Sequence, residues 1–197
     1  MKAKSIKGKS TEEIKAALQQ SMAADFKPTL AIIFLSFKVD RKSVCKILDD
    51  EGIPVFGATT NGQFIDEETK SAAIVVLLLD INPKYFYIIF DEFPEKNCRE
   101  KTRTVAKKSL EKFAHPAFLI ASSNTETDAE ELLLGIEDII GKHVNVYGGG
   151  AGDDYTFSEQ FVFTNKKESN RGMVVLVLDE DKIKIKGKAT CGWNAIG

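Results

Sequence analysis

Apolar residues return every three or four positions in four segments of the chain, and this spacing predicts four helices. The four segments are residues 10–22, 40–52, 97–114 and 127–142. Ser10 and Glu13 have the spacing of a capping box, which is expected to begin the first helix. Thr127 and Glu130 repeat this spacing at the start of the fourth helix, and Asp40 is expected to cap the second.

Runs of apolar and β-branched residues alternate with these helices and predict about nine strands. The runs lie within residues 29–36, 53–57, 71–80, 84–93, 115–122, 144–148, 159–165, 171–180 and 182–193. Strands and helices in this order predict an α/β fold, with mixed and largely antiparallel sheets covered by helices. If each half of the chain builds its own sheet, the layers follow the order αββα. A single mixed sheet with helices on both faces is the alternative.

The order of elements repeats in the two halves of the chain. In each half an apolar strand ends at a serine, Ser36 or Ser122, and a helix follows. A strand of the pattern Val-aromatic-Gly then enters a loop of small residues, and a later apolar run ends at an aspartate. This order predicts one domain over residues 1–197, made of two pseudo-repeats at about 10–95 and 96–197.

The two loops that follow the Val-aromatic strands, GATTNGQF and GGGAGDDY, are candidate ligand sites. They are expected to lie close together at the interface between the halves, and clefts between such units commonly bind ligands. The glycines of the second loop expose backbone N–H groups, which suits a carboxylate or another anion. These glycines are Gly148, Gly149, Gly150 and Gly152. The spacing excludes a Walker A loop and a dinucleotide fingerprint, which leaves two interpretations: a ligand cradle, or a turn where two backbones pass closely.

Polar residues around these loops are candidate ligand contacts and equally candidate turn caps. They are Ser36, Thr59, Thr60, Asn61, Ser122, Asp153 and Asp154. For the adjacent aspartates we rank local capping first, recognition of a ligand amine second and metal binding last, because neighbouring carboxylates on a strand point to opposite faces. Trp193 is expected either to seal a core or to stack on a ligand.

Nucleophilic catalysis has little support in the sequence. The two histidines, His115 and His143, stand at element boundaries, where a base paired with a nucleophile is not expected. Cys191 is interpreted as a buried thiol. We therefore predict a protein that is not an enzyme and binds no metal. A hydrolase or transferase that uses Cys191, or a metal at Asp153 and Asp154, is the alternative from that class.

Charge and composition limit the classes of partner and the cellular location that can be expected. The 197 residues include 27 Lys and Arg against 29 Asp and Glu, so the net charge of −2 gives no general attraction to nucleic acid or acidic membranes. The longest apolar run, residues 72–79, is too short to cross a bilayer. The three cysteines are far apart and form no paired framework, which favours a reduced, cytoplasmic protein.

Several blocks of the sequence, taken in order, resemble the signature of the FIST N-terminal domain over about residues 10–197. The blocks are GATTNGQF, SAAIVVLLL, VYGGGAGDD, FVF, RGMVVLVL and CGWNAIG. In the family the first loop usually reads Gly-Cys-Ser-Thr-Ala-Gly followed by an acidic residue. This chain has Ala58, Thr59, Thr60, Asn61, Gly62 and Gln63 in those places, so that Ala58 replaces the cysteine and Gln63 the acidic residue.

The resemblance implies a sensory domain of intracellular signal transduction proteins, found in bacteria, that binds a small ligand such as an amino acid. It also implies a FIST C-terminal domain, absent from residues 1–197, and a downstream signalling module or partner. Some relatives are haem-dependent nitric oxide sensors, so haem sensing is a second hypothesis, with His115 or His143 as axial ligand. Our first expectation is that the ligand contacts the two loops and that no cofactor is bound.

Overall fold

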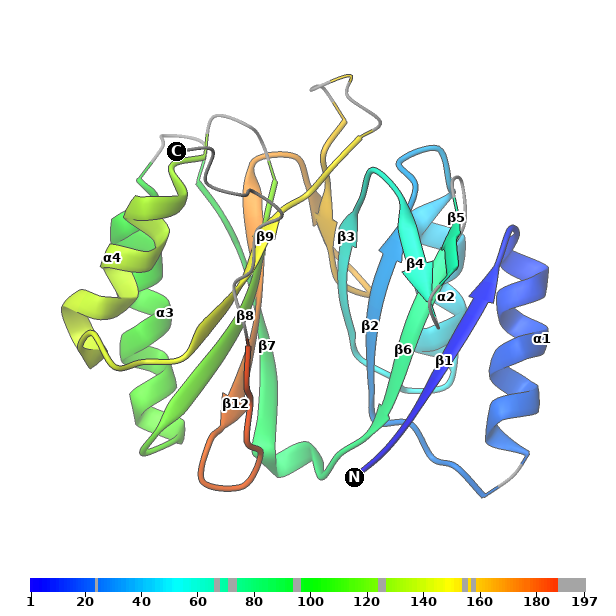
Figure 1. The fold of residues 1–197 in the computed structure, drawn as a ribbon, viewed down its shortest axis with the longest axis horizontal. Helices are drawn as coiled ribbons and strands as arrows, with labels where there is room; N and C mark the ends of the chain where they lie inside the picture. The colour runs from blue at the N-terminus through cyan, green and yellow to red at the C-terminus, as the bar shows by residue number, and fades with distance from the viewer. Residues whose placement is uncertain are drawn as a thin grey trace, which may run out of the picture.

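Two β-sheets lie face to face between two pairs of helices in the computed structural model of this protein (Figure 1). The structure describes residues 1–23, 25–65, 68–70, 74–93, 97–123, 127–153, 156 and 159–187. Helices α1 and α2 cover the outer face of one sheet, and α3 and α4 cover the outer face of the other (Figure 1). The predicted α/β fold is thus confirmed, and the layers follow the order αββα.

The first sheet has the strand order β1-β6-β2-β3-β10-β11. Its strands are β1 (Lys2–Gly8), β2 (Leu30–Leu35), β3 (Val55–Thr59), β6 (Ile74–Asp80), β10 (Val162–Phe163) and β11 (Glu168–Ser169). Only β2 and β3 are parallel, and all other neighbours are antiparallel. Its helices are α1 (Thr11–Met22) and α2 (Arg41–Asp50). A short hairpin of β4 (Gln63–Ile65) and β5 (Glu68–Lys70) lies between β3 and β6 in the chain.

The second sheet has the strand order β7-β12-β8-β9. Its strands are β7 (Phe86–Glu92), β8 (Pro116–Ser122), β9 (Val146–Gly150) and β12 (Gly172–Asp179). Again one pair, β8 and β9, is parallel and the others are antiparallel. Its helices are α3 (Cys98–Lys112) and α4 (Ala129–Ile140).

The two sheets are built by the same succession of elements. The first runs β1-α1-β2-α2-β3-β6 and the second β7-α3-β8-α4-β9-β12, with corresponding strands in corresponding places. A 3₁₀ turn, Pro83–Tyr85, joins the two. The halves therefore divide at this turn, earlier than the expected boundary near residue 95, because β7 pairs with β12 along its whole length. That the halves are repeats of one ancestral unit stays a prediction.

Apolar side chains form three layers of core. One lies between the first sheet and its helices and includes Ile14, Ile33 and Leu48; another lies between the second sheet and its helices. The third, which includes Phe56 and Leu176, joins the two sheets. Each large apolar side chain buried in this way contributes roughly 1.5–3 kcal/mol, so burial stabilises the contact between the two sheets as well as the packing of the helices.

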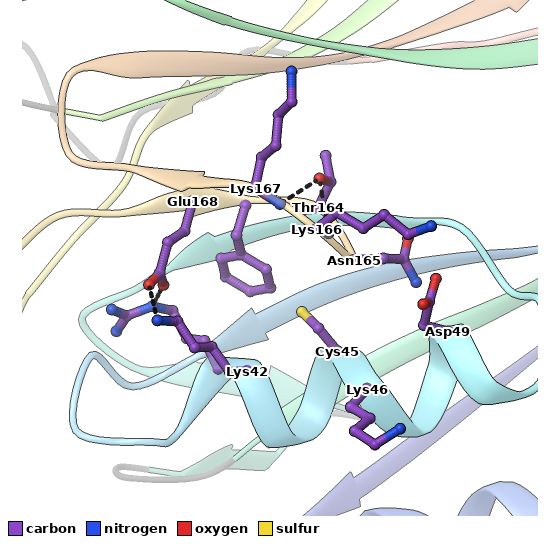
Figure 2. Close-up of a pocket in the computed structure, with 11 residues that line it drawn as sticks. Lys42, Cys45, Lys46, Asp49, Thr164, Asn165, Lys166, Lys167 and Glu168 are labelled. Atoms are coloured by element: carbon purple, nitrogen blue, oxygen red, sulfur yellow. Dashed lines mark hydrogen bonds and ion pairs between the residues drawn. The ribbon is translucent and has the colours of Figure 1, made fainter.

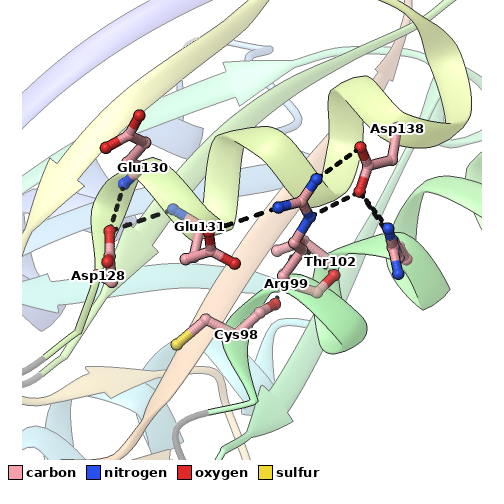
Figure 3. Close-up of polar contacts among 8 residues, drawn as sticks. Cys98, Arg99, Thr102, Asp128, Glu130, Glu131 and Asp138 are labelled. Atoms are coloured by element: carbon pink, nitrogen blue, oxygen red, sulfur yellow. Dashed lines mark hydrogen bonds and ion pairs between the residues drawn. The ribbon is translucent and has the colours of Figure 1, made fainter.

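Two of the predicted helix caps are correct and one is wrong. The side chains of Ser10 and Asp40 accept hydrogen bonds from backbone N–H groups of α1 and α2, as expected. In α4 the cap is Asp128 rather than Thr127: its carboxylate accepts from the N–H groups of Glu130 and Glu131 (Figure 3). The hydroxyl of Thr127 donates instead to the carbonyl of Ser123, 2.7 Å away. A charged carboxylate is the stronger acceptor at a helix N-terminus.

Helices α3 and α4 pack closely because Gly135 has no side chain. A Cβ at this position would lie 2.0 Å from the Thr102 hydroxyl oxygen. Beside this contact Arg99 donates to both carboxylate oxygens of Asp138, at 2.7 and 2.9 Å (Figure 3). This hydrogen bond, with a second from Arg103, lowers the pKa of Asp138 to about 2. The helix pair of the second half thus has an ionic clamp on its exposed side.

Two strand predictions at the ends of the chain are wrong. Strand β1 was not expected, because its lysines alternate with small residues and only Ile6 and Gly8 are buried. The alternating strand expected over residues 182–193 is not formed in its described part: residues 184–187 belong to no strand. Ile183 and Ile185 pack against the core between the sheets, which explains the alternation without any strand pairing. The remainder of that segment, with Cys191 and Trp193, lies outside the described residues.

Candidate functional site

The two loops that the repeat predicts to be close do lie in contact. The N–H of Gly152, after β9, donates to the carbonyl of Thr59 at the end of β3, with a distance of 2.8 Å. A Cβ on Gly152 would lie 2.9 Å from the backbone nitrogen of Asn61, so this glycine is needed for the close approach. The loops therefore pack directly against each other at the junction of the halves.

Asp153 is buried and caps its own loop. Its side chain is only 1% exposed, and Oδ2 accepts hydrogen bonds from the Thr156 hydroxyl at 2.7 Å and from the N–H of Glu159 at 2.9 Å. This is the first of the roles considered for the aspartate pair. Recognition of a ligand by Asp153 would require this loop to open. Asp154 lies outside the described residues.

The other polar candidates beside the loops hold the backbone in place. The Thr59 hydroxyl accepts from the N–H of Phe161 at 2.9 Å, and Thr59 is fully buried. Ser36 is also buried, and its hydroxyl accepts from the N–H of Lys38. The carbonyl of Ser122 accepts from the N–H of Ala151 at 2.7 Å. The contacts of Thr59 and Ser36 explain their short hydroxyl side chains, whereas the contact of Ser122 uses only its backbone.

The three consecutive glycines belong to strand β9 and not to a loop. Gly148, Gly149 and Gly150 are all exposed, at the outer edge of the second sheet. Gly148 has a φ of +151°, and a Cβ there would lie 1.8 Å from the carbonyl oxygen of Ile120. A Cβ on Gly149 or Gly150 would meet nothing within 4 Å. Close packing on β8 thus explains the first glycine, and leaves the other two without a packing role.

An apolar pocket of about 430 Å³ opens beside the first of the two loops. It lies on the face of the first sheet that points away from α1 and α2, because its walls come from the strand positions that alternate with those of the outer core. The lining residues are Ser5, Ile32, Phe34, Thr60, Gly62, Gln63, Phe64, Ile65, Val75 and Leu77. The second sheet leaves this part of the face uncovered, so Phe34 is 38% exposed.

The loop after β3 and the strand β4 form one wall of this pocket. The buried side chain of Gln63 donates from Nε2 to both oxygens of Thr60, the carbonyl at 3.2 Å and the hydroxyl at 2.9 Å. Phe64 follows and is 79% exposed at the rim. Thr60 was a candidate from the sequence, whereas Phe34, Val75 and the other apolar walls were not. The sequence feature that could have indicated these walls is that the runs LAIIFL and IVVLLLD are apolar on both faces of their strands.

A second cavity, of about 340 Å³, lies between α2 and the hairpin of β10 and β11 (Figure 2). Lysines surround it, with Lys42 on the helix and Lys166 and Lys167 on the hairpin. Arg41 is held in place by Glu168 at 2.9 Å and lies over the ring of Phe161 at 4.0 Å. Its charge is thus already paired.

Cys45 lies on the helix side of this cavity and faces the hairpin (Figure 2). It is only 3% exposed, and burial raises the pKa of its thiol to about 12. Cys45 is therefore a packing residue, because a thiol with so high a pKa is not a nucleophile at neutral pH.

Neither histidine lies in the pockets described above. His115 is exposed, with Nδ1 3.0 Å from both carboxylate oxygens of Asp181, and its hydrogen bond lowers the pKa of Asp181. His143 is exposed after α4. Within the described ranges, no three His, Cys, Asp or Glu side chains gather in a way that could hold a metal ion. Neither His115 nor His143 is therefore placed as an axial haem ligand within these pockets.

Comparison with known proteins identifies the family. None of the described helices has the length and apolar character that a membrane-spanning helix requires. A search among curated proteins gave no match. The family of FIST N domains matches over residues 29–197, which include both sheets except β1, both glycine-containing segments and the pocket walls on β2 and β6. The chain therefore belongs to the FIST N domain family, whose members are sensory domains of signal transduction.

Proposed function

We propose that this domain is a non-catalytic sensor and that its small ligand binds in the apolar pocket beside Thr60. The observation that carries the proposal is the pocket itself: about 430 Å³ of apolar surface on a rigid sheet, next to a polar loop. Ligand sites are usually concave and mostly apolar, with few polar groups, and have volumes of roughly 300–1,000 Å³. The lysine-lined cavity beside α2 is a weaker candidate, because the guanidinium of Arg41 in its wall is already paired with Glu168.

The walls define the chemistry of the ligand. An apolar or aromatic body would lie against Phe34, Val75 and Leu77, where it would cover surface that is now exposed to water. The Thr60 hydroxyl accepts a hydrogen bond from Gln63, so its own proton is available to a carboxylate or carbonyl oxygen of the ligand. An amino acid with an apolar side chain, or a metabolite of similar size, meets both requirements.

Ligand binding would be transmitted through the contact between the two loops. The polar wall of the pocket, Thr60, is one residue away from Thr59, which accepts the hydrogen bond of Gly152 from the other half. A ligand that favours one arrangement of this contact would shift the equilibrium between two ways in which the halves pack together. A FIST C-terminal domain and a downstream signalling partner in the cytoplasm are the proposed receivers of that shift.

A thermal-shift screen of the complete chain against amino acids and organic acids tests this proposal. A ligand present at one hundred times its Kd should raise stability by about 2.7 kcal/mol. Phe64→Ala should abolish the shift and hardly change the melting temperature of the free protein, because Phe64 is mostly exposed. Leu110→Ala on α3 is the matched control, since Leu110 is another exposed apolar residue but lies far from the pocket.

Val75→Phe gives an independent test, because the larger side chain would fill the pocket that Val75 lines. Loss of the ligand-induced shift in both pocket variants, with retention in Leu110→Ala, supports the proposal. Ligand shifts of unchanged size in both pocket variants would place the site elsewhere. A complete absence of shifts across the screen would refute recognition of this class of metabolite.

A further inference from the structure

Two neighbouring threonines at the end of β3 use their hydroxyl groups differently. The Thr59 hydroxyl accepts from the N–H of Phe161 at 2.9 Å and donates to the carbonyl of the same residue at 3.4 Å. The Thr60 hydroxyl accepts from Gln63 at 2.9 Å and donates to no described residue. Thr59 is fully buried, whereas Thr60 is partly exposed and lines the apolar pocket. Thr60 therefore has a proton to offer to the occupant of the pocket.

The orientation of the Gln63 amide is fixed by the loop itself. Its terminal nitrogen lies 3.2 Å from the carbonyl oxygen of Thr60 and 2.9 Å from the hydroxyl oxygen of the same residue. A carbonyl oxygen only accepts hydrogen bonds, so the amide atom beside it has to be the nitrogen. Gln63 is 2% exposed, and a rotated amide would lose these bonds in a buried place. The Thr60 hydroxyl is consequently an acceptor toward Gln63, and its proton points elsewhere.

Both ends of this short loop are held by backbone hydrogen bonds. The N–H of Thr60 donates to the carbonyl of Leu35 at the end of β2, with a distance of 3.0 Å. Gln63 is the first residue of β4 and lies opposite Lys70 in the hairpin. The hydroxyl of Thr60 and the amide of Gln63 therefore keep their relation when a ligand enters, because no change of the loop is needed to reach them.

A hydroxyl held in this way discriminates between the polar groups of ligands. A carboxylate or carbonyl oxygen accepts the Thr60 proton and completes the hydrogen bonds of the hydroxyl. An ammonium group has only protons to give. It would have to use the remaining lone pair of the hydroxyl, leave the Thr60 proton unpaired and face the positive end of the Gln63 amide dipole. The arrangement thus favours an acceptor at this end of the pocket.

We propose that Gln63 is the specificity-determining residue of the apolar pocket: it makes Thr60 a donor and so selects ligands with a carboxylate or carbonyl oxygen over amines. Gln63 acts as a positioning residue, since it sets the hydrogen bonding of Thr60. The inference rests on the proposed function, because it requires the ligand to bind in this pocket. It narrows the ligand class to an apolar body whose acceptor meets Thr60, and it places the ammonium group of any amino acid away from that end.

Three compounds that share a phenylethyl body test this selection. Hydrocinnamate has a carboxylate, benzylacetone an uncharged ketone and phenethylamine an ammonium group. NMR titration of the backbone amide signals of the complete chain measures weak dissociation constants and shows where each compound binds. Hydrocinnamate and benzylacetone should bind at the loop of residues 60–65 at least about tenfold more tightly than phenethylamine. Benzylacetone separates the effect of the hydrogen bond from that of a negative charge.

Gln63→Glu is the decisive variant, because it keeps the shape of the side chain and reverses its hydrogen bond to Thr60. A charged glutamate accepts from the Thr60 hydroxyl. A protonated glutamate donates to the Thr60 carbonyl and accepts from the hydroxyl with its other oxygen. In both forms the hydroxyl turns its lone pairs toward the pocket. Phenethylamine should then bind more tightly than hydrocinnamate, a reversal that a merely structural role of Gln63 would not produce.

Thr60→Val and Thr104→Val form a matched pair that does not place an acid in a buried position. Thr104 is an exposed threonine of α3, and its hydroxyl donates to the carbonyl of Glu100 in its own helix. Thr60→Val should remove at least about tenfold of the preference for hydrocinnamate over phenethylamine, because the donor is lost. Thr104→Val should leave all three affinities within about twofold.

The outcomes separate the role of Gln63 from the position of the ligand site. Equal affinity of the three compounds in the pocket, or a preference that survives both Gln63→Glu and Thr60→Val, would overturn the role of Gln63 and leave the pocket as the site. Signals that move only outside the pocket, or no saturable binding of any of the compounds, would overturn the pocket and this inference together.

Discussion

The two halves of the molecule share one succession of elements and differ in the segment that follows the third strand. In the first half this segment forms the hairpin of β4 and β5, whose first strand, with the preceding loop, walls the apolar pocket. In the second half it crosses to the other sheet, where β10 and β11 close the edge of β3. The difference shows how one plan is varied: the first insertion walls a pocket, and the second leaves the outer edge of β9 without a partner strand among the described residues.

The largest expected difference between the halves is the reactivity of a thiol at the corresponding helix positions. Cys45 should resist iodoacetamide at pH 8, because burial raises the pKa of its thiol to about 12. Leu133 comes five residues after the cap Asp128, as Cys45 does after the cap Asp40, but Leu133 is exposed. A cysteine introduced by Leu133→Cys should therefore have an ordinary pKa near 8.5, and hence a thiolate fraction more than about a thousandfold higher than that of Cys45. Mass spectrometric mapping of the alkylated sites measures both. Similar labelling rates at the two positions would show that the second half is covered there too.

The next largest effect concerns Phe163, which packs against β3 and α2 in the core of the first half. Phe163→Ala should lower the free energy of unfolding by about 3–5 kcal/mol, as expected for a fully buried phenylalanine. Phe64→Ala is the matched control, because the same substitution at an exposed site should cost less than about 1 kcal/mol. Urea denaturation gives both values. Equal losses for the two variants would contradict the assignment of Phe163 to the core.

The helix caps test the similarity of the halves instead of their difference. Asp40→Ala and Asp128→Ala should each cost about 1 kcal/mol, because each carboxylate accepts from two N–H groups of its helix. Thr127→Ala should cost less than Asp128→Ala, since the Thr127 hydroxyl bonds only to a loop carbonyl. The comparison uses the same denaturation measurement. A larger loss at Thr127 would restore the capping box expected from the sequence.

The smallest effect is the pH dependence of the clamp between α3 and α4. Hydrogen bonds from Arg99 and Arg103 lower the pKa of Asp138 to about 2 in the folded protein, against roughly 3.9 in an unfolded chain. The stabilisation is therefore complete above about pH 4 and is lost as the pH falls towards 2. Asp138→Asn should lower the melting temperature at pH 7 and flatten its decline between pH 4 and pH 2. An unchanged pH profile would show that the exposed clamp adds nothing to stability.

Local patterns predict most of the fold. Helical spacing and short polar caps locate all four helices, because helix formation and capping depend on neighbours along the chain. The repeated order of elements also predicts the contact between the loops at Thr59 and Gly152. It does not predict that β10 pairs with β3, since that choice rests on packing between Phe163 and Gly57 across distant parts of the chain.

The candidate sites are less well predicted than the fold. The sequence directs attention to the glycines and to Asp153, whereas Asp153 is buried as a cap and the glycines lie in a strand whose outer edge no other described strand pairs with. The pocket walls on β2 and β6 are missed, because a continuous apolar strand gives no sign of which face another sheet will leave uncovered. The exposure of Leu133, which lines a cavity beside β9, is not predicted either, because helical spacing assigns this residue to the packed face of its helix.

Amide hydrogen exchange of the glycines in β3 and β9 tests the central difference most directly. In the free protein the N–H groups of Gly148 and Gly150 should exchange quickly, and those of Gly149 and Gly57 slowly, because among the described residues only the latter point at a neighbouring strand. If Gly148 and Gly150 are already as protected as Gly57, the outer edge of β9 is covered and the two halves do not differ in this respect.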